Sequence, residues 1–209
     1  MSTNLEVIDL AKAKEDFRNY KDSDNHDTVK NHYREMRKNQ TVEFVKKMHD
    51  KYSFAPGRER ARLTIKQVFK VLENYVDSSD PDVTLPNMIH MFQTAEGIRK
   101  AGYPDWFQLV GLIHDMGKIM YLWGDKDCGQ VGTAEGPQWA LGGDTWVVGA
   151  KIPPCTVFPE FNELNPDMAN PAYNTDNGMY TPGCGLDNLL FAYGHDEYLY
   201  QMVVSTSTR

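Results

Sequence analysis

Cysteine is scarce in this chain of 209 residues, and its placement excludes a disulfide framework. The three cysteines, Cys128, Cys155 and Cys184, are an odd number at wide spacing and form no CxxC pair for a metal. No run of about 18 apolar residues is present, so the sequence predicts no membrane span. The N-terminal stretch MSTNLEVIDLAKAKEDF is charged and lacks the apolar core of a signal peptide. These absences predict a cytoplasmic protein with reduced thiols.

Positive charge is also in short supply. The chain has 22 Lys and Arg against 29 Asp and Glu, which gives a formal net charge of −7. A nucleic-acid-binding protein would normally carry a basic face, so the charge argues against that partner. Hydrophobic residues make up 41% and charged residues 24%, a balance typical of a folded globular chain. A single domain of this length can bury its own core.

Apolar residues recur at helical spacing in several segments that prolines and glycines separate. The expected helices run over residues 41–52, 65–76, 86–101, 104–123 and 186–202. Residues 124–185 instead contain many Gly and Pro turn signals, with short strands expected at 146–148 and 156–158. The predicted fold class is all-α, a helical bundle with a long irregular loop region that carries short strands.

Three of the six histidines lie within these apolar helical patterns. His90, His114 and His195 are on different predicted helices, and Asp115 directly follows His114. A buried aspartate is costly unless something neutralises it, and a metal ion does so. Imidazole and carboxylate suit iron, zinc or manganese. A lone helical histidine is more often a packed or surface residue than a ligand, so the spacing alone leaves both interpretations open.

The remaining histidines, His26, His32 and His49, sit among charged residues and are expected to be solvated. Lys118 follows Asp115 by three residues, so it either forms an i, i+3 ion pair with that aspartate or faces a bound polar substrate. Gly117 lies beside these residues and would allow a neighbouring segment to approach closely.

Longer strings in the sequence resemble the myo-inositol oxygenase family. The matching strings are FRNY, DPDV, HMFQTAEGIRK, DWFQLVGLIHDMGK, PQWA, GDT, GMY, CGLD and GHDEY, at residues 17–20, 80–83, 90–100, 105–118, 137–140, 143–145, 178–180, 184–187 and 194–198. Together they extend over roughly residues 15–203. The resemblance implies an HD-domain-like helical fold, a non-haem di-iron centre with two iron ions, and O2-dependent cleavage of myo-inositol to D-glucuronate. That reaction is the first step of inositol catabolism.

The resemblance also implies roles for particular residues. It assigns His90 and His114 to one iron, Asp115 to a bridge between both irons, and His195 to the second iron. Lys118 and Asp115 are the expected catalytic residues, because a lysine ammonium can stabilise a developing alkoxide. The implied substrate-binding residues are Arg18, Asp77, Ser78, Ser79, Lys118, Gly143 and Asp144. Ser78 stands where a Glu is common in the family.

Two departures from the family pattern carry expectations of their own. Residues 125–134 look inserted and are expected to form a surface bulge. Family members continue with further helices that supply one more histidine and one more aspartate ligand, so this chain is expected to be C-terminally truncated. Apolar faces of the helices that carry His90, His114 and His195 should then be exposed.

The domain organisation follows from these patterns. Residues 1–40 are expected to be a charged segment that covers the substrate site, residues 41–203 an incomplete HD-domain-like core, and residues 204–209 a polar tail. The expected partners are myo-inositol and O2, with no nucleic acid and no membrane, and the chain is expected to be a monomer. The alternatives are an inactive truncated form, an HD-type metal-dependent phosphohydrolase, and a zinc site made by the three histidines and Asp115.

Overall fold

The computed structural model describes residues 20, 26–80, 86–133 and 136–207. Its α-helices are α1 (His26–Asn39), α2 (Val42–Lys51), α3 (Ile65–Leu72), α4 (Asn87–Lys100), α5 (Asp105–Ile113) and α6 (His195–Ser207). Short 3-10 helices connect them: η2 (Met116–Trp123), η3 (Lys126–Cys128), η4 (Pro159–Leu164), η5 (Pro166–Ala169) and η6 (Leu186–Asn188). The all-α fold class is confirmed for these residues.

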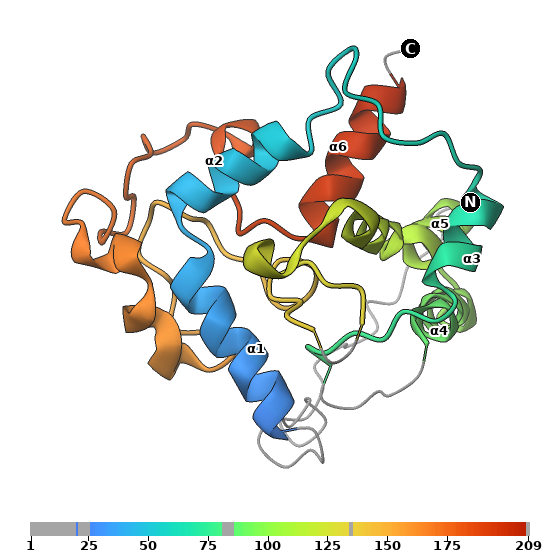
Figure 1. The fold of residues 1–209 in the computed structure, drawn as a ribbon, viewed down its shortest axis with the longest axis horizontal. Coiled ribbons are helices and arrows are strands. Elements are labelled where there is room, and N and C mark those ends of the chain that lie inside the picture. The colour runs from blue at the N-terminus through green and yellow to red at the C-terminus, as the bar shows by residue number, and fades with distance from the viewer. Residues whose placement is uncertain (1–19, 21–25, 81–85, 134–135, 208–209) are drawn as a thin grey trace, which may run out of the picture.

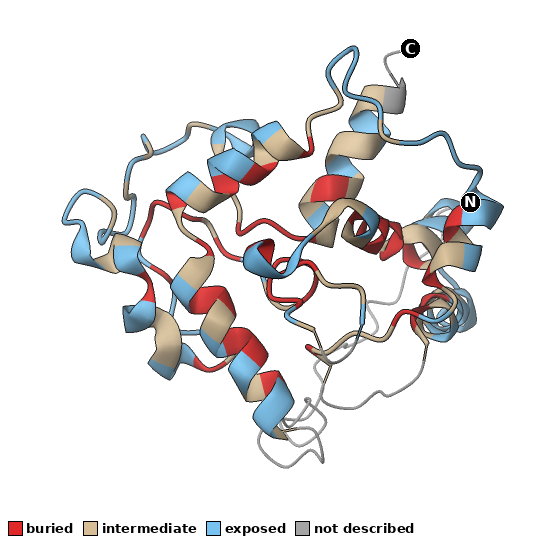
Figure 2. Ribbon diagram, viewed as in Figure 1, coloured by how far each residue is buried: buried red, intermediate tan, exposed pale blue. Residues whose placement is uncertain are grey.

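The helices begin where the sequence supplies start signals. Thr41 accepts a hydrogen bond from the backbone of Phe44 ahead of α2, and Thr64 forms a reciprocal capping box with Gln67 ahead of α3. Proline precedes α4 and α5. α4 packs against α5, α6 against η2, and α1 against η4 (Figure 1). Buried residues line the inner faces of α1 and α2 and the segments that run between the helices (Figure 2).

The predicted helix over residues 104–123 is divided in two. α5 ends at Ile113 and η2 begins at Met116, so His114 and Asp115 lie at the junction rather than inside a continuous helix. The prediction was wrong here because Asp115 adopts φ −93° and ψ 0°, a conformation that turns the chain into the tighter 3-10 geometry. α3 likewise ends early, at Leu72.

The last predicted helix is displaced along the chain. α6 begins at His195 rather than Leu186, and it continues to Ser207. The preceding residues are extended because their backbone pairs with residues 146–148: Leu190 accepts from Val148 N at 2.9 Å, and Ala192 N donates to Trp146 O at 2.8 Å. Leu186 therefore falls in η6 and is highly exposed, against the prediction that it lies on the apolar face of a helix.

Neither expected strand forms a sheet in the described part of the chain. The expected strand at 146–148 contributes an isolated antiparallel bridge between Val147 and Phe191. The expected strand at 156–158 is absent there: the backbone N–H of Val157 donates to the Asp144 carboxylate, and Phe158 has a left-handed φ of 52°. A strand cannot continue through that conformation.

Two surface predictions were also wrong. His32 is buried, because it lies on the same inner face of α1 as Val29, Tyr33 and Met36. His26 and His49 are half-buried.

The prediction of a surface bulge is right only in part, because residues 125–127 and 133 are exposed whereas residues 128–130 are buried. Cys128 and Gln130 are buried, and Gln130 Oε1 accepts a hydrogen bond from the Tyr52 hydroxyl at 2.5 Å. Gly129 has a φ of 65° and lies directly against the ring of Trp139, where a Cβ would overlap with the indole. Residues 128–130 are therefore part of the core beside α2.

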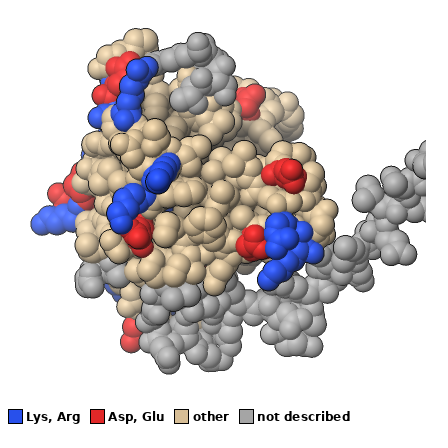
Figure 3. All heavy atoms as spheres, turned by 90° about the vertical axis from the view of Figure 1, so that its right-hand side faces the viewer, with Lys and Arg blue, Asp and Glu red and all other residues tan. Residues whose placement is uncertain are grey.

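The outer faces of α4, α5 and α6, which carry or adjoin the three helical histidines, are apolar and exposed, as expected. The exposed large hydrophobic side chains of α4, α5 and α6 are Ile89, Phe92, Trp106, Leu109, Val110, Tyr200, Val203 and Val204. Figure 3 turns the α3–α5 side toward the viewer, and most of the described surface there is uncharged. None of the described helices has the length and apolarity needed to cross a membrane.

One buried cation joins α1 to the irregular region. Arg37 has an exposed fraction of 0% and makes a two-point contact with Asp144, with Nη1–Oδ1 at 3.0 Å and Nη2–Oδ2 at 2.8 Å. Its guanidinium also donates to Asn162 and to Val157 O, and it lies over the Trp146 ring. This contact pairs a charge that would otherwise be costly to bury.

We expect Arg37→Met to lower the free energy of unfolding by about 3 kcal/mol, because it leaves Asp144 without its cation. Arg34→Met, on the exposed side of the same helix, should have little effect. Urea denaturation of the metal-free proteins measures both changes. Equal small losses in the two variants would contradict the structural role of the buried pair.

Candidate metal centre

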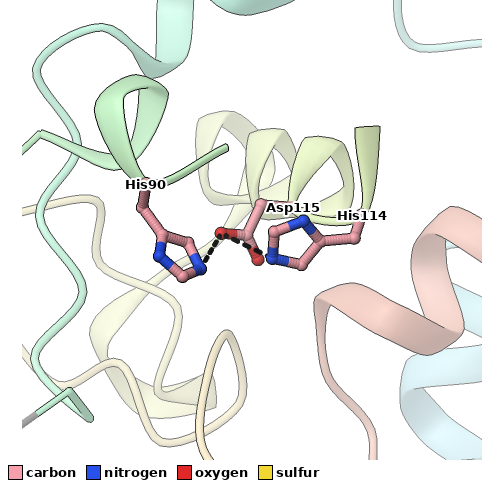
Figure 4. Close-up of side chains that lie close together, drawn as sticks. All are labelled: His90, His114 and Asp115. Atoms are coloured by element: carbon pink, nitrogen blue, oxygen red, sulfur yellow. Dashed lines mark ion pairs between the residues drawn. The ribbon is translucent and has the colours of Figure 1, made fainter. Parts of the chain in front are cut away.

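His90, His114, His195 and Asp115 converge at one place, although they come from different elements. His90 lies on α4, His114 and Asp115 follow α5, and His195 begins α6. His90 Nε2 is 3.8 Å and His114 Nε2 3.4 Å from Asp115 Oδ2, while His195 Nε2 is 3.1 Å from Oδ1. Figure 4 shows His90 and His114 approaching the carboxylate from different sides. The ligand atoms of His90, His114 and Asp115 lie within 4.8 Å of one another, as in a metal site.

Glycines allow the elements that carry these residues to approach closely. A Cβ at Gly117 would overlap with the backbone oxygen of His195, so the start of α6 can lie here only against a glycine. Gly111 on α5 also lies against α4, but a Cβ there would meet only the end of the flexible Ile98 side chain, at 2.4 Å. The expectation of close approach at Gly117 is therefore confirmed.

Backbone carbonyls orient two of the imidazoles. His114 Nδ1 lies 2.7 Å from Gly111 O, and His195 Nδ1 lies 2.6 Å from Leu141 O. A carbonyl can only accept, so Nδ1 carries the proton in both rings. In the neutral imidazoles Nε2 then has a free lone pair, and in both cases that nitrogen faces Asp115. This arrangement is typical of histidines that bind a metal through Nε2.

The Asp115 side chain is a buried anion, and one of its two oxygens lacks a hydrogen-bond donor among the described residues. Its exposed fraction is 2%, and Oδ2 accepts no well-oriented hydrogen bond from the described residues, although Lys118 Nζ is 3.0 Å away. Burial alone would raise its pKa, but His195, Lys118 and His114 together hold the pKa well below the usual aspartate range. An ionised, buried and under-coordinated oxygen between imidazoles fits a bound cation.

The histidines respond to this carboxylate in different ways. Burial disfavours the charged form of His195, but its hydrogen bond with Asp115 and the negative charges of Asp115 and Asp196 together outweigh burial and raise the pKa. At His90 burial predominates, and the pKa is lowered. Without a metal, His195 is therefore more readily protonated than His90.

Lys118 lies beside the centre and is almost fully buried. Its Nζ is 2.8 Å from Asp77 Oδ2, 3.0 Å from Asp115 Oδ2 and 2.9 Å from Asn87 Oδ1. Burial alone would lower the pKa of Lys118, but the two carboxylates raise it. The predicted i, i+3 pair with Asp115 is confirmed, and Asp77 is a second anionic partner that the spacing did not reveal.

The predicted substrate-binding residues form two facing turns. In the first turn, Ser79 donates to Asp77 Oδ1 from its backbone N–H at 2.8 Å and from its hydroxyl at 2.6 Å. In the second turn, a Cβ at Gly142 would lie 2.8 Å from the Asp77 carboxylate oxygens, so the turns are in close contact. Gly143 continues this second turn with a φ of 99°.

His32 joins the two turns. Its Nδ1 is 3.4 Å from Ser78 Oγ and its Nε2 is 3.3 Å from Gly142 O. Asp144 lies nearby, but its carboxylate contacts Arg37 rather than Lys118. Arg18 is outside the described residues.

Sequence reasoning missed the buried polar partners His32, Arg37 and Asn87. For the first two, a signal was present in the helical spacing of Val29, Tyr33 and Met36, which defines the inner face of α1. Asn87 had no comparable signal, because its contact with Lys118 joins segments that are distant in the chain.

Three imidazoles surround one buried carboxylate in an all-helical scaffold, and two of them form with it a group that could hold a metal ion. A family model described as myo-inositol oxygenase matches residues 26–209. The inositol oxygenase of Mus musculus is 47% identical over 198 residues, which cover 93% of this chain and 64% of the relative. The Homo sapiens inositol oxygenase is 44% identical with the same coverage. A probable inositol oxygenase of Oryza sativa is 40% identical and is covered to 59%.

The chain belongs to the myo-inositol oxygenase family. It spans about 64% of the length of the mammalian relatives it matches. Membership of this family implies iron as the metal, and His90, His114 and Asp115 form a group that could bind it.

The position of Asp115 among the imidazoles predicts that removing its charge will lower the affinity for a metal ion. Asp115→Asn should weaken binding of Fe²⁺ or Mn²⁺ by at least about tenfold, because the amide keeps the shape of the carboxylate but not its charge. His49→Gln, at a histidine away from the centre, should bind as the wild type does. Anaerobic calorimetric titration measures the affinities, and equal affinity of wild type and Asp115→Asn would exclude Asp115 as a ligand.

The ion pair between the half-buried Asp77 and the buried Lys118 predicts a stability that depends on acid pH. Burial would raise the pKa of Asp77, but Lys118 and Ser79 lower it below the usual range. The fold therefore favours the ionised form, and this stabilisation is present above about pH 4 and lost as the pH falls further.

Asp77→Asn should accordingly lower the free energy of unfolding near neutral pH and flatten its decline between about pH 5 and about pH 3. Asp50→Asn, at an exposed ion pair with Arg58, should leave that slope unchanged. Urea denaturation in the presence of a chelator provides the measurement. The same slope in wild type and Asp77→Asn would contradict the assignment.

Proposed function

We propose that this chain carries the iron-binding centre of an inositol oxygenase, which cleaves the ring of myo-inositol with O2 to give D-glucuronate. The observation that carries the proposal is the placement of the two Asp115 oxygens. Oδ2 faces His90 and His114, whereas Oδ1 faces His195. A carboxylate placed in this way can contact two metal ions at once, one on each side.

The residues present fit iron in their chemistry. Imidazole nitrogen and carboxylate oxygen are common ligands of non-haem iron. His90 and His114 would hold one ion, His195 the other, and Asp115 both. When bound, iron would supply Lewis acidity toward the substrate hydroxyls and a redox-active site at which O2 can take up electrons that the substrate provides.

The surrounding residues support a polyol as the substrate. Carboxylate, hydroxyl and backbone groups of the two turns at 77–79 and 142–143 offer both donors and acceptors, as hydroxyl groups require. Lys118 keeps a positive charge at the edge of the centre, where it can stabilise negative charge that develops on a substrate oxygen. A set of hydrogen-bond donors and acceptors of this kind suits a neutral molecule with several hydroxyl groups.

A phosphate ester is a poorer fit to the same residues. Lys118 is the cation beside the described centre, and Asp77 and Asp115 already lie 2.8 and 3.0 Å from its ammonium. A phosphoryl group would meet both carboxylates at close range, and like charges repel strongly in a buried site. This arrangement favours the oxygenase over the HD-type phosphohydrolase.

The test is O2 consumption by protein loaded anaerobically with Fe²⁺. With myo-inositol present, wild type should consume O2 and form D-glucuronate in equal amounts. His195→Ala should lose at least about 100-fold of that rate through loss of an iron ligand. His49→Gln should retain the rate. Protein that binds iron but forms no D-glucuronate would show that the chain is an inactive form, and activity with zinc alone would overturn the assignment of iron.

A further inference from the structure

Asn87, the first residue of α4, has a buried carboxamide whose oxygen accepts a hydrogen bond while its nitrogen donates none among the described residues. Its exposed fraction is 3%. The carboxamide oxygen accepts a hydrogen bond from Lys118 Nζ at 2.9 Å, and the backbone N–H donates to Tyr75 O at 2.7 Å. The carboxamide nitrogen, Nδ2, is buried and has no hydrogen-bond partner among the described residues.

The orientation of this carboxamide is fixed by its neighbour. A lysine ammonium can only donate, so the atom that faces Lys118 must be the oxygen. Rotating the amide by 180° would place two donors against each other. Nδ2 therefore points away from Lys118, although it belongs to the same carboxamide whose oxygen contacts the ammonium. An unsatisfied buried N–H costs about 1–3 kcal/mol, so a donor of this kind calls for an acceptor.

Lys118 itself is already surrounded by side-chain oxygens, and its contact with Asp115 Oδ2 is an ion pair without a well-oriented hydrogen bond. Its ammonium has three hydrogens, and three side-chain oxygens lie within 3.0 Å of it. A ligand oxygen that arrives beside Lys118 would thus find the free N–H of Asn87. Asn87 also lies one helical turn before His90, which places the two side chains on the same face of α4.

We propose that Asn87 is a further substrate-binding residue and also positions Lys118. Oδ1 holds the ammonium against the Asp115 carboxylate, and one Nδ2 hydrogen donates to a hydroxyl oxygen of the bound polyol. The second hydrogen is available to another substrate oxygen or to water. The inference rests on the proposed function, because it takes myo-inositol as the ligand.

The test compares two buried asparagines. Asn87→Leu keeps the size of the side chain and removes both polar ends. Asn165→Leu makes the same change at a carboxamide with an exposed fraction of 3%, whose nitrogen donates to Arg37 O at 2.8 Å and to Gln40 O at 3.0 Å. Both variants are loaded with Mn²⁺ and titrated with myo-inositol by calorimetry, which requires no turnover.

Asn87→Leu should weaken inositol binding about tenfold or more without changing the affinity for Mn²⁺. Asn165→Leu should lower the free energy of unfolding and leave inositol affinity per folded molecule unchanged. A merely structural role for Asn87 would make the two variants behave alike. Asn87→Ser, a smaller polar change suited to the start of a helix, provides the same comparison if Asn87→Leu does not fold.

Inositol affinity equal to wild type in a folded Asn87 variant would overturn this inference and leave the oxygenase proposal intact. Wild-type protein that binds Mn²⁺ but no myo-inositol would overturn both. Weakened binding in both Asn87 and Asn165 variants would assign the effect to folding and reject the specific role of Asn87.

Discussion

The structure depends on the Asp115 carboxylate, a buried negative charge that has three imidazoles and the Lys118 ammonium as neighbours. A carboxylate that is 2% exposed persists in the ionised form only if its surroundings compensate for lost water. Three imidazoles and Lys118 do so, and they come from α4, the α5–η2 junction and the start of α6. Gly117 then becomes a structural requirement, since a Cβ there would overlap with the backbone of His195 at the start of α6.

The polar network extends from Asp115 into the region proposed to bind substrate. Lys118 joins Asp115 to Asp77, and Asp77 touches the turn that contains Gly142. His32 links the same two turns from α1. Metal centre and substrate region are therefore one connected set of buried polar groups, in which a change at one member alters the electrostatic field at the others. Such continuity suits a reaction in which a substrate bound at the metal also contacts protein donors.

Arg37 provides a second, separate anchor. It ties α1 to the long irregular region through Asp144, Asn162 and Val157. A region with so little regular structure leaves many backbone groups to satisfy, and buried side chains such as Arg37 and Asn165 take over that function. The resemblance placed Asp144 with the substrate, a role that remains a prediction; in the structure its two oxygens contact Arg37.

The sequence by itself determined the helical class, the starts of α2 to α5, the family, and the convergence of His90, His114, Asp115 and His195. Local signals carry that information: apolar spacing, Thr and Pro at helix starts, and long family strings. Tertiary structure alone decided the break at Asp115, the late start of α6, the burial of His32 and of residues 128–130, and the contacts of Lys118 with Asp77 and Asn87. These features arise from contacts between residues far apart in the chain. Local helix propensity does not specify which distant residue will form a hydrogen bond or ion pair with a buried polar group.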